Sequence, residues 1–446
     1  MPTESEDAGT SSYWLGAVDA RPLAIFRIAL GLVLLQDLYA QARGLEAFYT
    51  DQGIFPRAPP AMPWMWSVFQ LTGTTVGVTL LFATGALATL AFTAGLFTRV
   101  ATAATWVLFV SLEHRVPEIH NGGDRLAALL LFFGAFANLS GRYSLDALRS
   151  GGCTEVPALA PRLLQATPVL LYFSTAIEKI RDAGWGWFDG SVISANVRLR
   201  GWTRFGGVWL QGHPSLCTAI GAATIVIELA IPLLFYSPFA PRVTRLLAII
   251  GHVGLQVGIL LSFKVAMFTY VALATTPLWF VPSWLDRFEA KPLGGSGSAA
   301  PRLDPAGLLL VGIFALVAIA PHTPKTVGRV LPWTALDLNV GLFAWAYPSM
   351  HWEPRGELED GRAVDPLPPD ADFSDRFTNS LWMQLPYRLQ DYGPLGRMVC
   401  ERFESHGGPR LRRWSLTRVI MAPYREGEPP REEKRRIVLE QDCDHR

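Results

Sequence analysis

The stretch "PLAIFRIALGLVLLQDLY" (residues 22–39) decides the class of fold, because it is apolar along almost its whole length. Arg27 and Asp37 are its only charged residues. A helix that crosses a lipid bilayer needs about 20 consecutive, mostly apolar residues. The stretch therefore predicts a membrane-spanning helix near the start of the chain.

The rest of the sequence extends this prediction. The chain has 446 residues, of which 50% are hydrophobic and 17% are charged, whereas soluble domains carry about 25% charged residues. The mean hydropathy is +0.24. We therefore predict a mainly α, polytopic helical membrane bundle of eight or nine spans, a multi-pass protein of the cell membrane with the lipid bilayer as its partner. The further apolar runs cover residues 74–97, 99–112, 124–140, 163–181, 216–236, 243–263, 265–281 and 305–321.

Composition divides the chain into three parts. Residues 1–19 form a polar, acidic N-terminal tail, unlike a cleaved signal peptide, so the first span should remain as an anchor. Residues 20–325 form the helical membrane domain, which includes a flexible linker at 291–305, "KPLGGSGSAAPRLDP". Residues 332–446 form an extramembrane module of mixed or mainly β character, in which "WSLTRVIMAPY" and "RRIVLEQ" are predicted strands.

Two classes of partner find no support in the sequence. The four cysteines show no CxxC or zinc-type spacing, so we predict no metal site. No basic stripe with interleaved aromatic residues is present, which argues against nucleic-acid binding. Cys400 and Cys443 both lie in the C-terminal module and could form a disulfide if that module faces an oxidising compartment.

Ionisable side chains within the apolar runs are candidates for special roles, because each costs at least ~2.5 kcal/mol at membrane depth. Arg27 and Asp37 are about 15 Å apart along a helix and cannot pair with each other. We expect Asp37 to snorkel toward water and Arg27 to find a partner on another helix. Glu228, in the middle of "TIVIELAIPLLF", is one candidate partner, since it is too deep to snorkel.

Two further motifs carry polar groups. In "GHVGLQVGILL", His252 and Gln256 are four residues apart and share one helical face, where His252 could serve structure or function. In "PEIHNGGDRL", Asn121 or Asp124 could cap the helix that follows. A helix N-terminus also attracts anions and polarised oxygen atoms, so a cap and a ligand contact both remain open.

The stretch "YFSTAIEKIRDAGWGWFDG" (172–190) places charge at the end of an apolar run. Tyr172 and Lys179 lie on one helical stripe. Lys179 could simply snorkel to the membrane boundary. If it is buried instead, desolvation favours its neutral amine, which is a usable base. Trp185 and Trp187 would then line a pocket for an aromatic, oxygen-bearing ligand such as a quinol.

Four segments, in order, resemble the HTTM-domain family, which includes the vitamin K-dependent γ-glutamyl carboxylases. They are "ARPLAIFRIALGLVLLQDL", "HNGGDRLAALLLFFGAFANLSGRYSLDAL", "YFSTAIEKIRDAGWGWFDG" and "GHVGLQVGILLSFKVAMFTYVALATTPLWF", within about residues 17–285. The resemblance implies a lyase in which a lysine deprotonates reduced vitamin K or another quinol. Oxygenation then gives a strong base that removes a γ-proton from a peptide or protein glutamate before CO2 adds. The resemblance places Lys179 at the position of the base and His252, a second candidate catalytic residue, in a span where the carboxylases also have a histidine.

This chain departs from the family pattern at one position. The carboxylases carry a catalytic-site histidine in the segment that matches "HNGGDRL", where this chain has Gly123, with His120 three residues earlier. Two hypotheses therefore remain. The first is an enzyme for quinol-dependent oxidation or carboxylation with Lys179 as the base. The second is a non-catalytic or transport-type membrane protein in which Arg27, Glu228 and His252 form a structural core.

Overall fold

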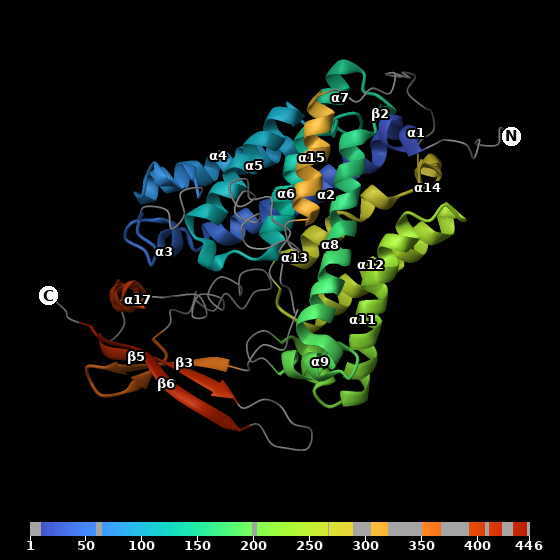
Figure 1. The fold of residues 1–446 in the computed structure, drawn as a ribbon. Helices are drawn as coiled ribbons and strands as arrows, with labels where there is room; N and C mark the ends of the chain where they lie inside the picture. Colours follow the sequence, from blue (N-terminus) through green and yellow to red (C-terminus); the bar gives the residue numbers. More distant parts are fainter. Residues whose placement is uncertain are drawn as a thin grey trace.

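A computed structural model describes residues 10–58, 65–198, 203–265, 267–288, 305–319, 350–366, 392–405, 410–421 and 431–443. This part of the chain is mainly helical, with a small sheet near the C-terminus (Figure 1). Its long helices are α2 (Ala20–Ala42), α4 (Thr75–Ala94), α5 (Thr98–Arg115), α6 (Gly122–Phe136), α8 (Leu159–Ala183), α11 (Pro214–Phe235), α12 (Pro241–Ser262) and α15 (Pro305–Ile319).

Short helices connect the long ones. They are α1 (Thr10–Leu15), α3 (Leu45–Tyr49), α7 (Leu145–Ser150), α9 (Ser191–Asn196), α10 (Phe205–Leu210), α13 (Phe268–Ala274) and α14 (Pro282–Leu285). The 3₁₀ turns are η1 (Val68–Gln70), η2 (Pro117–Ile119), η3 (Gly184–Trp187), η4 (Thr276–Trp279) and η5 (Asp286–Phe288).

Four of the described helices, α2, α4, α11 and α12, are long and apolar enough to cross a membrane. The predicted runs around α5, α6, α8 and α15 are also helical, but these helices are shorter or carry more charge. The mainly helical fold is thus confirmed, with four candidate spans among the described helices, and the count of eight or nine stays a prediction.

The predicted span at 265–281 is wrong, because the structure breaks it into α13, with 7 residues, and η4, with 4. The hydroxyl of Thr275 donates to the carbonyl of Ala272 at 2.6 Å, and that of Thr276 donates to the carbonyl of Leu273 at 2.7 Å. Pro277 has no backbone N–H to continue the helix. The helix therefore ends well short of the length that a bilayer requires.

Polar contacts at one end of the bundle fix the starts of two helices. Strand β1 (Ala17–Asp19) pairs antiparallel with β2 (Glu155–Pro157), directly before α2 and near the start of α8. The Asp19 carboxylate accepts the backbone N–H of Arg21 at 2.8 Å and so caps α2. Arg21 in turn pairs with Asp286 at 2.8 Å, which ties the first long helix to the turn η5.

Arg27 is fully buried and does not pair with Glu228, so the suggested partner was wrong. Its guanidinium donates to the carbonyls of Thr93 at 3.3 Å, Leu139 at 2.8 Å and Tyr143 at 2.5 Å. The Thr93 carbonyl lies in the last turn of α4, where free carbonyls carry the partial negative charge of a helix C-terminus, and the other two carbonyls lie in the loop after α6. Arg27 therefore joins α2 to the end of α4 and to this loop through backbone acceptors.

Asp37 does not snorkel, because its side chain lies inside the bundle with 8% of the residue exposed. The amide of Gln41, one turn further along α2, donates to its carboxylate at 2.5 Å. The hydroxyl of Tyr49, from α3, donates to the Gln41 carbonyl oxygen. A buried hydrogen-bond partner thus replaces the expected contact with water.

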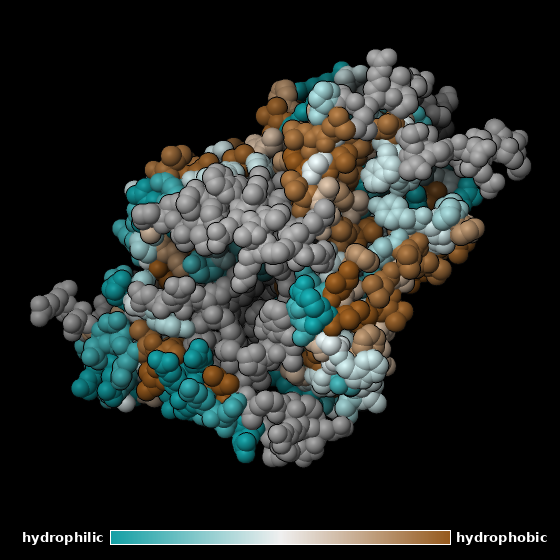
Figure 2. All heavy atoms as spheres, in the orientation of Figure 1, coloured by the Kyte–Doolittle hydropathy of each residue, from teal (hydrophilic) through white to brown (hydrophobic). Residues whose placement is uncertain are grey.

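The C-terminal strands form a four-stranded antiparallel sheet in the order β4-β3-β5-β6. The strands are β3 (Met350–Leu358), β4 (Ala363–Val364), β5 (Leu411–Met421) and β6 (Glu432–Asp442), and α17 (Gly393–Ser405) packs on β5 and β6. Both strands predicted from the sequence are confirmed as β5 and β6. Hydrophilic residues gather over this sheet, whereas hydrophobic residues cover much of the helical surface (Figure 2).

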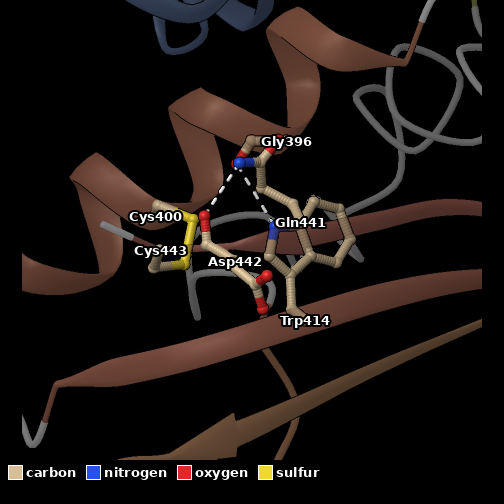
Figure 3. Close-up of a disulfide and its surroundings, with 6 residues drawn as sticks. All are labelled: Gly396, Cys400, Trp414, Gln441, Asp442 and Cys443. Atoms are coloured by element: carbon tan, nitrogen blue, oxygen red, sulfur yellow. Dashed lines mark hydrogen bonds between the residues drawn. A yellow bond between two sulfur atoms is a disulfide. The ribbon is translucent and has the colours of Figure 1, made fainter.

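A disulfide between Cys400 and Cys443 ties α17 to the residue that follows β6 (Figure 3). Beside it, the indole Nε1 of Trp414 donates to the carbonyl of Gly396 at 3.2 Å. Trp414 is fully buried and connects the middle of the sheet to the helix. The disulfide that the sequence allowed is therefore present in the structure.

Candidate functional site

A cavity of about 280 Å³ lies within the helical part of the chain, between α8, α11 and α12. The 3₁₀ turn η3 and the short helices α9, α10 and α13 complete its wall. Most of the lining is apolar, so the few polar groups stand out. The polar lining side chains are Tyr172, Thr175, Lys179, Trp187, Asn196, Thr224, Glu228, Gln256 and Ser262.

Lys179 and Glu228 form an ion pair at the cavity wall, with 2.5 Å between Nζ and Oε1. Lys179 comes from α8 and Glu228 from α11, and only 5% and 4% of these residues is exposed. The Lys179 Nζ also lies 5.2 Å from the ring centre of Trp187, within the range of a cation–π contact. Lys179 therefore does not snorkel, since its amine is held inside the protein between a carboxylate and an indole.

A chain of hydrogen bonds leads from the protein interior to the cavity. The Ala272 carbonyl can only accept, so the His252 Nε2, 3.1 Å away, must carry the proton. The His252 Nδ1 is then an acceptor for the Tyr172 hydroxyl at 2.6 Å. The Tyr172 oxygen accepts in turn from the Gln256 Nε2 at 2.7 Å. These successive hydrogen bonds turn the Gln256 Nε2 toward Tyr172 and so fix the orientation of the Gln256 amide at the cavity wall.

Two buried acceptors of the cavity lining have no hydrogen-bond partner among the described residues: the Gln256 Oε1 and the Glu228 Oε2. An unsatisfied buried polar atom costs roughly 1–3 kcal/mol, and most such atoms in proteins are paired. Both atoms accept rather than donate. The cavity therefore offers two places for a ligand, or for water, that supplies O–H or N–H groups.

The model of the HTTM domain matches residues 16–284, which is more than half of the chain. The chain belongs to the HTTM domain family. No curated protein and no solved structure matches it. The HTTM region contains the whole cavity lining, including the Lys179–Glu228 pair, and leaves α15 and the C-terminal sheet outside.

Within this HTTM domain, His252 is fully buried but does not line the cavity. Its ring lies behind Tyr172, with the two ring centres 5.7 Å apart, and beside Trp279 at 4.8 Å. His252 therefore contacts Tyr172, which lines the cavity, and does not line the cavity itself.

Asn121 and Asp124 form a reciprocal cap at the start of α6 and do not line the cavity. The Asn121 Oδ1 accepts from the N–H of Gly123 at 2.7 Å, and the Asp124 carboxylate accepts from the N–H of Asn121 at 2.8 Å. His120 pairs with Asp124 at 2.9 Å. Burial lowers the pKa of His120, but the charge and hydrogen bond of Asp124, together with the charges of Glu113 and Asp37, outweigh burial and leave that pKa above its ordinary value.

The backbone of Gly123 lies directly against Phe268, which itself lines the cavity. A Cβ atom at residue 123 would lie 2.6 Å from the Phe268 nitrogen and 2.7 Å from its Cα, and both are backbone atoms that cannot move aside. The HTTM domain of this chain therefore has no room for a histidine at this position.

Of the two tryptophans that the sequence assigned to the pocket, only Trp187 lines it. Trp187 is 3% exposed, whereas Trp185 is 74% exposed and packs against Phe188 at the surface. The backbone turns sharply at Gly184, with φ of +54°, and enters η3, which sends alternate indoles to opposite sides. The assignment of Trp185 to the pocket is wrong.

Several lining residues have no signal in the sequence. Asn196, Phe263 and Phe268 reach the cavity from loops and short helices. No periodic pattern marks them, because their positions depend on how α9 and α13 fold back on the long helices. Thr224 could have been found, since it lies one helical turn from Glu228 on the same face of α11.

Proposed function

We propose that this HTTM protein is a multi-pass membrane enzyme of the cell membrane that removes a proton from the hydroxyl of a quinol or a related aromatic alcohol. The observation that carries the proposal is the buried Lys179–Glu228 pair at the wall of an aromatic-lined cavity. Buried charged groups that converge with a few polar side chains on an apolar pocket make that pocket the default candidate for a reactive site.

The chemistry of the cavity suits a ligand of this class. Trp187, Phe263 and Phe268 offer aromatic faces to a ring, and the free oxygens of Gln256 and Glu228 offer acceptors to hydroxyl groups. The volume of about 280 Å³ lies near the lower end of the range for small-molecule pockets. It accommodates a ring head group, while a long prenyl tail such as that of vitamin K would have to extend outside.

The proton acceptor in this proposal is the pair rather than Lys179 alone. A neutral Lys–Glu pair holds one proton between its two members, and the Glu228 Oε2 accepts no hydrogen bond among the described residues, although the Thr175 side chain lies near the carboxylate. A proton taken from a bound hydroxyl changes the charge of the pair from zero to +1. That charge balances the negative charge left on the ligand oxygen, which the buried, apolar surroundings would otherwise oppose.

The proposal stops at the quinol step. In the carboxylase scheme, addition of CO2 to a glutamate substrate depends on a histidine where this chain has Gly123. The close contact between Gly123 and the backbone of Phe268 leaves no side chain there to replace it. Oxygen, as the co-reactant, would take two electrons and two protons in all from the quinol, which leaves the quinone and forms hydrogen peroxide.

A second candidate function is non-catalytic, and one observation favours it. Each charge of the pair already has its opposite within 2.5 Å, so the pair could serve only to join α8 to α11. A purely structural pair would tolerate replacement of both members by apolar residues without loss of the cellular role.

Oxygen uptake separates the two functions. Purified protein in lipid nanodiscs is mixed with a naphthoquinol, and the rate above the uncatalysed rate is measured. We expect Lys179→Met to reduce this rate at least a hundredfold, within the range that general bases contribute. Arg181→Ala is the matched control, because Arg181 lies two residues further on the same helix, is half exposed and pairs with Asp182. Equal rates in wild type and Lys179→Met would contradict the proposal.

A further inference from the structure

The cavity reaches the protein surface between α11 and α12, on a side formed by small residues. Ala223 on α11 and Gly254 and Gly258 on α12 line the cavity and are also exposed. Among the described residues, a Cβ atom built on Gly254 or Gly258 meets nothing within 4 Å apart from the backbone of its own helix. By contrast, a Cβ atom built on Gly251, one turn earlier, would lie 3.3 Å from the side chain of Ile227 on α11. The two helices are thus in contact at Gly251 and leave open space beside Gly254 and Gly258.

The surface around this opening is apolar. Val226 of α11 is 62% exposed, and Val257 and Leu261 of α12 are also exposed. Figure 2 shows hydrophobic residues gathered over α12. Both helices are candidate membrane spans. Gly254 lies eight residues before the end of α12 at Ser262, about 12 Å along the helix axis, which places it at the depth of acyl chains.

The cavity behind this opening also contains two polar atoms without a hydrogen-bond partner among the described residues. The Gln256 Oε1 and the Glu228 Oε2 line the cavity, are buried and accept no hydrogen bond among the described residues. Gln256 lies on α12 between the two exposed glycines in sequence. A ligand that entered past Gly254 and Gly258 would meet these acceptors at the inner end of its path.

We infer that the gap between α11 and α12 is a lateral entrance through which a lipid-dissolved ligand reaches the cavity from the bilayer. The ligand is an amphiphile with a small hydroxyl-bearing ring that enters the cavity and an apolar tail that stays between the helices and the acyl chains. The hydroxyl part of this inference rests on the proposed function, whereas the entrance depends only on the geometry of α11 and α12.

Hydrophobic photolabelling tests the entrance without knowledge of the natural ligand. The full-length protein in nanodiscs is irradiated with an apolar aryl diazirine dissolved in the lipid, and labelled peptides are identified by mass spectrometry. We expect the probe to label Leu171 and Ile193, which are buried and line the cavity. The amount of label at each is divided by the amount at Leu233, which is 75% exposed on α11 and serves as the surface reference. Absence of label at Leu171 and Ile193 in wild type would overturn the inference.

Variants that fill the gap locate the entrance. Gly254→Leu and Gly258→Leu should lower the normalised cavity labelling at least fivefold, and Ala223→Leu should do so from the facing helix. Gly312→Leu is the matched control, since Gly312 on α15 is exposed and a Cβ there also meets nothing within 4 Å. Unchanged labelling in all three gap variants would contradict an entrance at this place.

Two further comparisons separate this inference from the proposed function. Wild-type protein that is labelled by the apolar probe but shows no quinol-dependent oxygen uptake would contradict the proposed function and leave the entrance standing. A probe of the same ring with a phenolic hydroxyl should label the cavity at least threefold more than the hydroxyl-free probe, and Gln256→Met should reduce this preference. Equal labelling by the two probes in wild type would contradict the hydroxyl-bearing head group and leave the entrance standing.

Discussion

The Lys179 amine and the Glu228 carboxylate are 2.5 Å apart, and both are almost entirely shielded from solvent. When one member of a buried pair is removed, the other is left as an uncompensated charge, which typically costs 3–5 kcal/mol. We therefore expect Lys179→Met and Glu228→Leu each to lower the free energy of unfolding by about that amount. The double variant Lys179→Met/Glu228→Leu should recover most of the loss, because no buried charge remains.

Thermal unfolding of the four proteins in the same detergent measures this coupling. Additive losses in the double variant would show that the two side chains do not interact. Quinol-dependent oxygen uptake should remain absent in the double variant even though its stability returns, which distinguishes a reactive pair from one that only holds helices together.

The chain from His252 through Tyr172 to Gln256 predicts a positioning effect. Tyr172→Phe removes the hydroxyl that joins His252 Nδ1 to the Gln256 amide, so two buried polar groups lose their partner. We expect a loss of stability of about 1–3 kcal/mol. In oxygen-uptake assays KM should rise more than kcat falls, because the Gln256 acceptor loses its fixed orientation. A large fall in kcat at constant KM would instead indicate that Tyr172 takes part in the chemistry.

Replacement of Gly123 by alanine should destabilise the protein, unlike replacement of a helix glycine that faces open space. Gly123→Ala places a Cβ atom 2.6 Å from the backbone nitrogen of Phe268, and overpacking of this kind costs about 1–3 kcal/mol. Gly312→Ala makes the same chemical change in open space on α15, where alanine favours a helix by up to about 1 kcal/mol. The melting temperature should therefore fall for Gly123→Ala and rise slightly for Gly312→Ala; equal shifts would contradict the packing of Gly123 on Phe268.

His120 predicts a dependence of stability on pH. Burial opposes its charged form, but Asp124, together with the weaker charges of Glu113 and Asp37, raises its pKa above the ordinary value. Because the pKa of His120 is higher in the folded state than in the unfolded state, protonation of His120 stabilises the folded protein. This stabilisation reaches its full value below the unfolded pKa of about 6.5 and is lost as the pH rises through the folded pKa. The stability difference between wild type and His120→Gln should therefore be largest below about pH 6.5 and shrink at alkaline pH. A difference that grows with pH would contradict a charged His120.

The Cys400–Cys443 disulfide closes a loop with a sequence separation of 43. The chain-entropy model gives about 4 kcal/mol for a loop of this length. We expect Cys400→Ser/Cys443→Ser to destabilise the C-terminal sheet by about 2–4 kcal/mol, measured by proteolysis of that region. Because disulfides persist in oxidising compartments, mass spectrometry without reduction should find the two cysteine peptides joined. Free thiols in protein isolated under thiol-blocking conditions would contradict this.

Much of the fold was predictable from the sequence, because long apolar runs and alternating strands carry local signals. The runs at 216–236 and 243–263 match α11 and α12 closely, and the strands around Trp414 and Ile437 match β5 and β6. The run at 265–281 failed, because hydropathy does not register how Thr275, Thr276 and Pro277 end a helix. The division into three domains stays a prediction.

The sequence identified individual residues of the site, but not which of them pair or which face the cavity. The stripe of Tyr172 and Lys179 was visible at helical spacing, and both side chains line the cavity. The partner of Glu228 was not, because the sequence offers both Arg27 and Lys179 and only the packing of α8 on α11 selects the lysine. Trp185 and Trp187 are equivalent in sequence, and the turn at Gly184 decides which of them faces inward.

The central claim is that the Lys179–Glu228 pair takes a proton from a hydroxyl in the cavity. The most direct measurement is the ultraviolet absorption spectrum of a naphthol bound to the protein, since naphthol and naphtholate absorb at different wavelengths. The account predicts that bound naphthol ionises at a lower pH in wild type than in free solution, and that Glu228→Gln and Lys179→Met abolish this change. Bound naphthol that stays neutral in wild type, or that ionises equally in both variants, would contradict it.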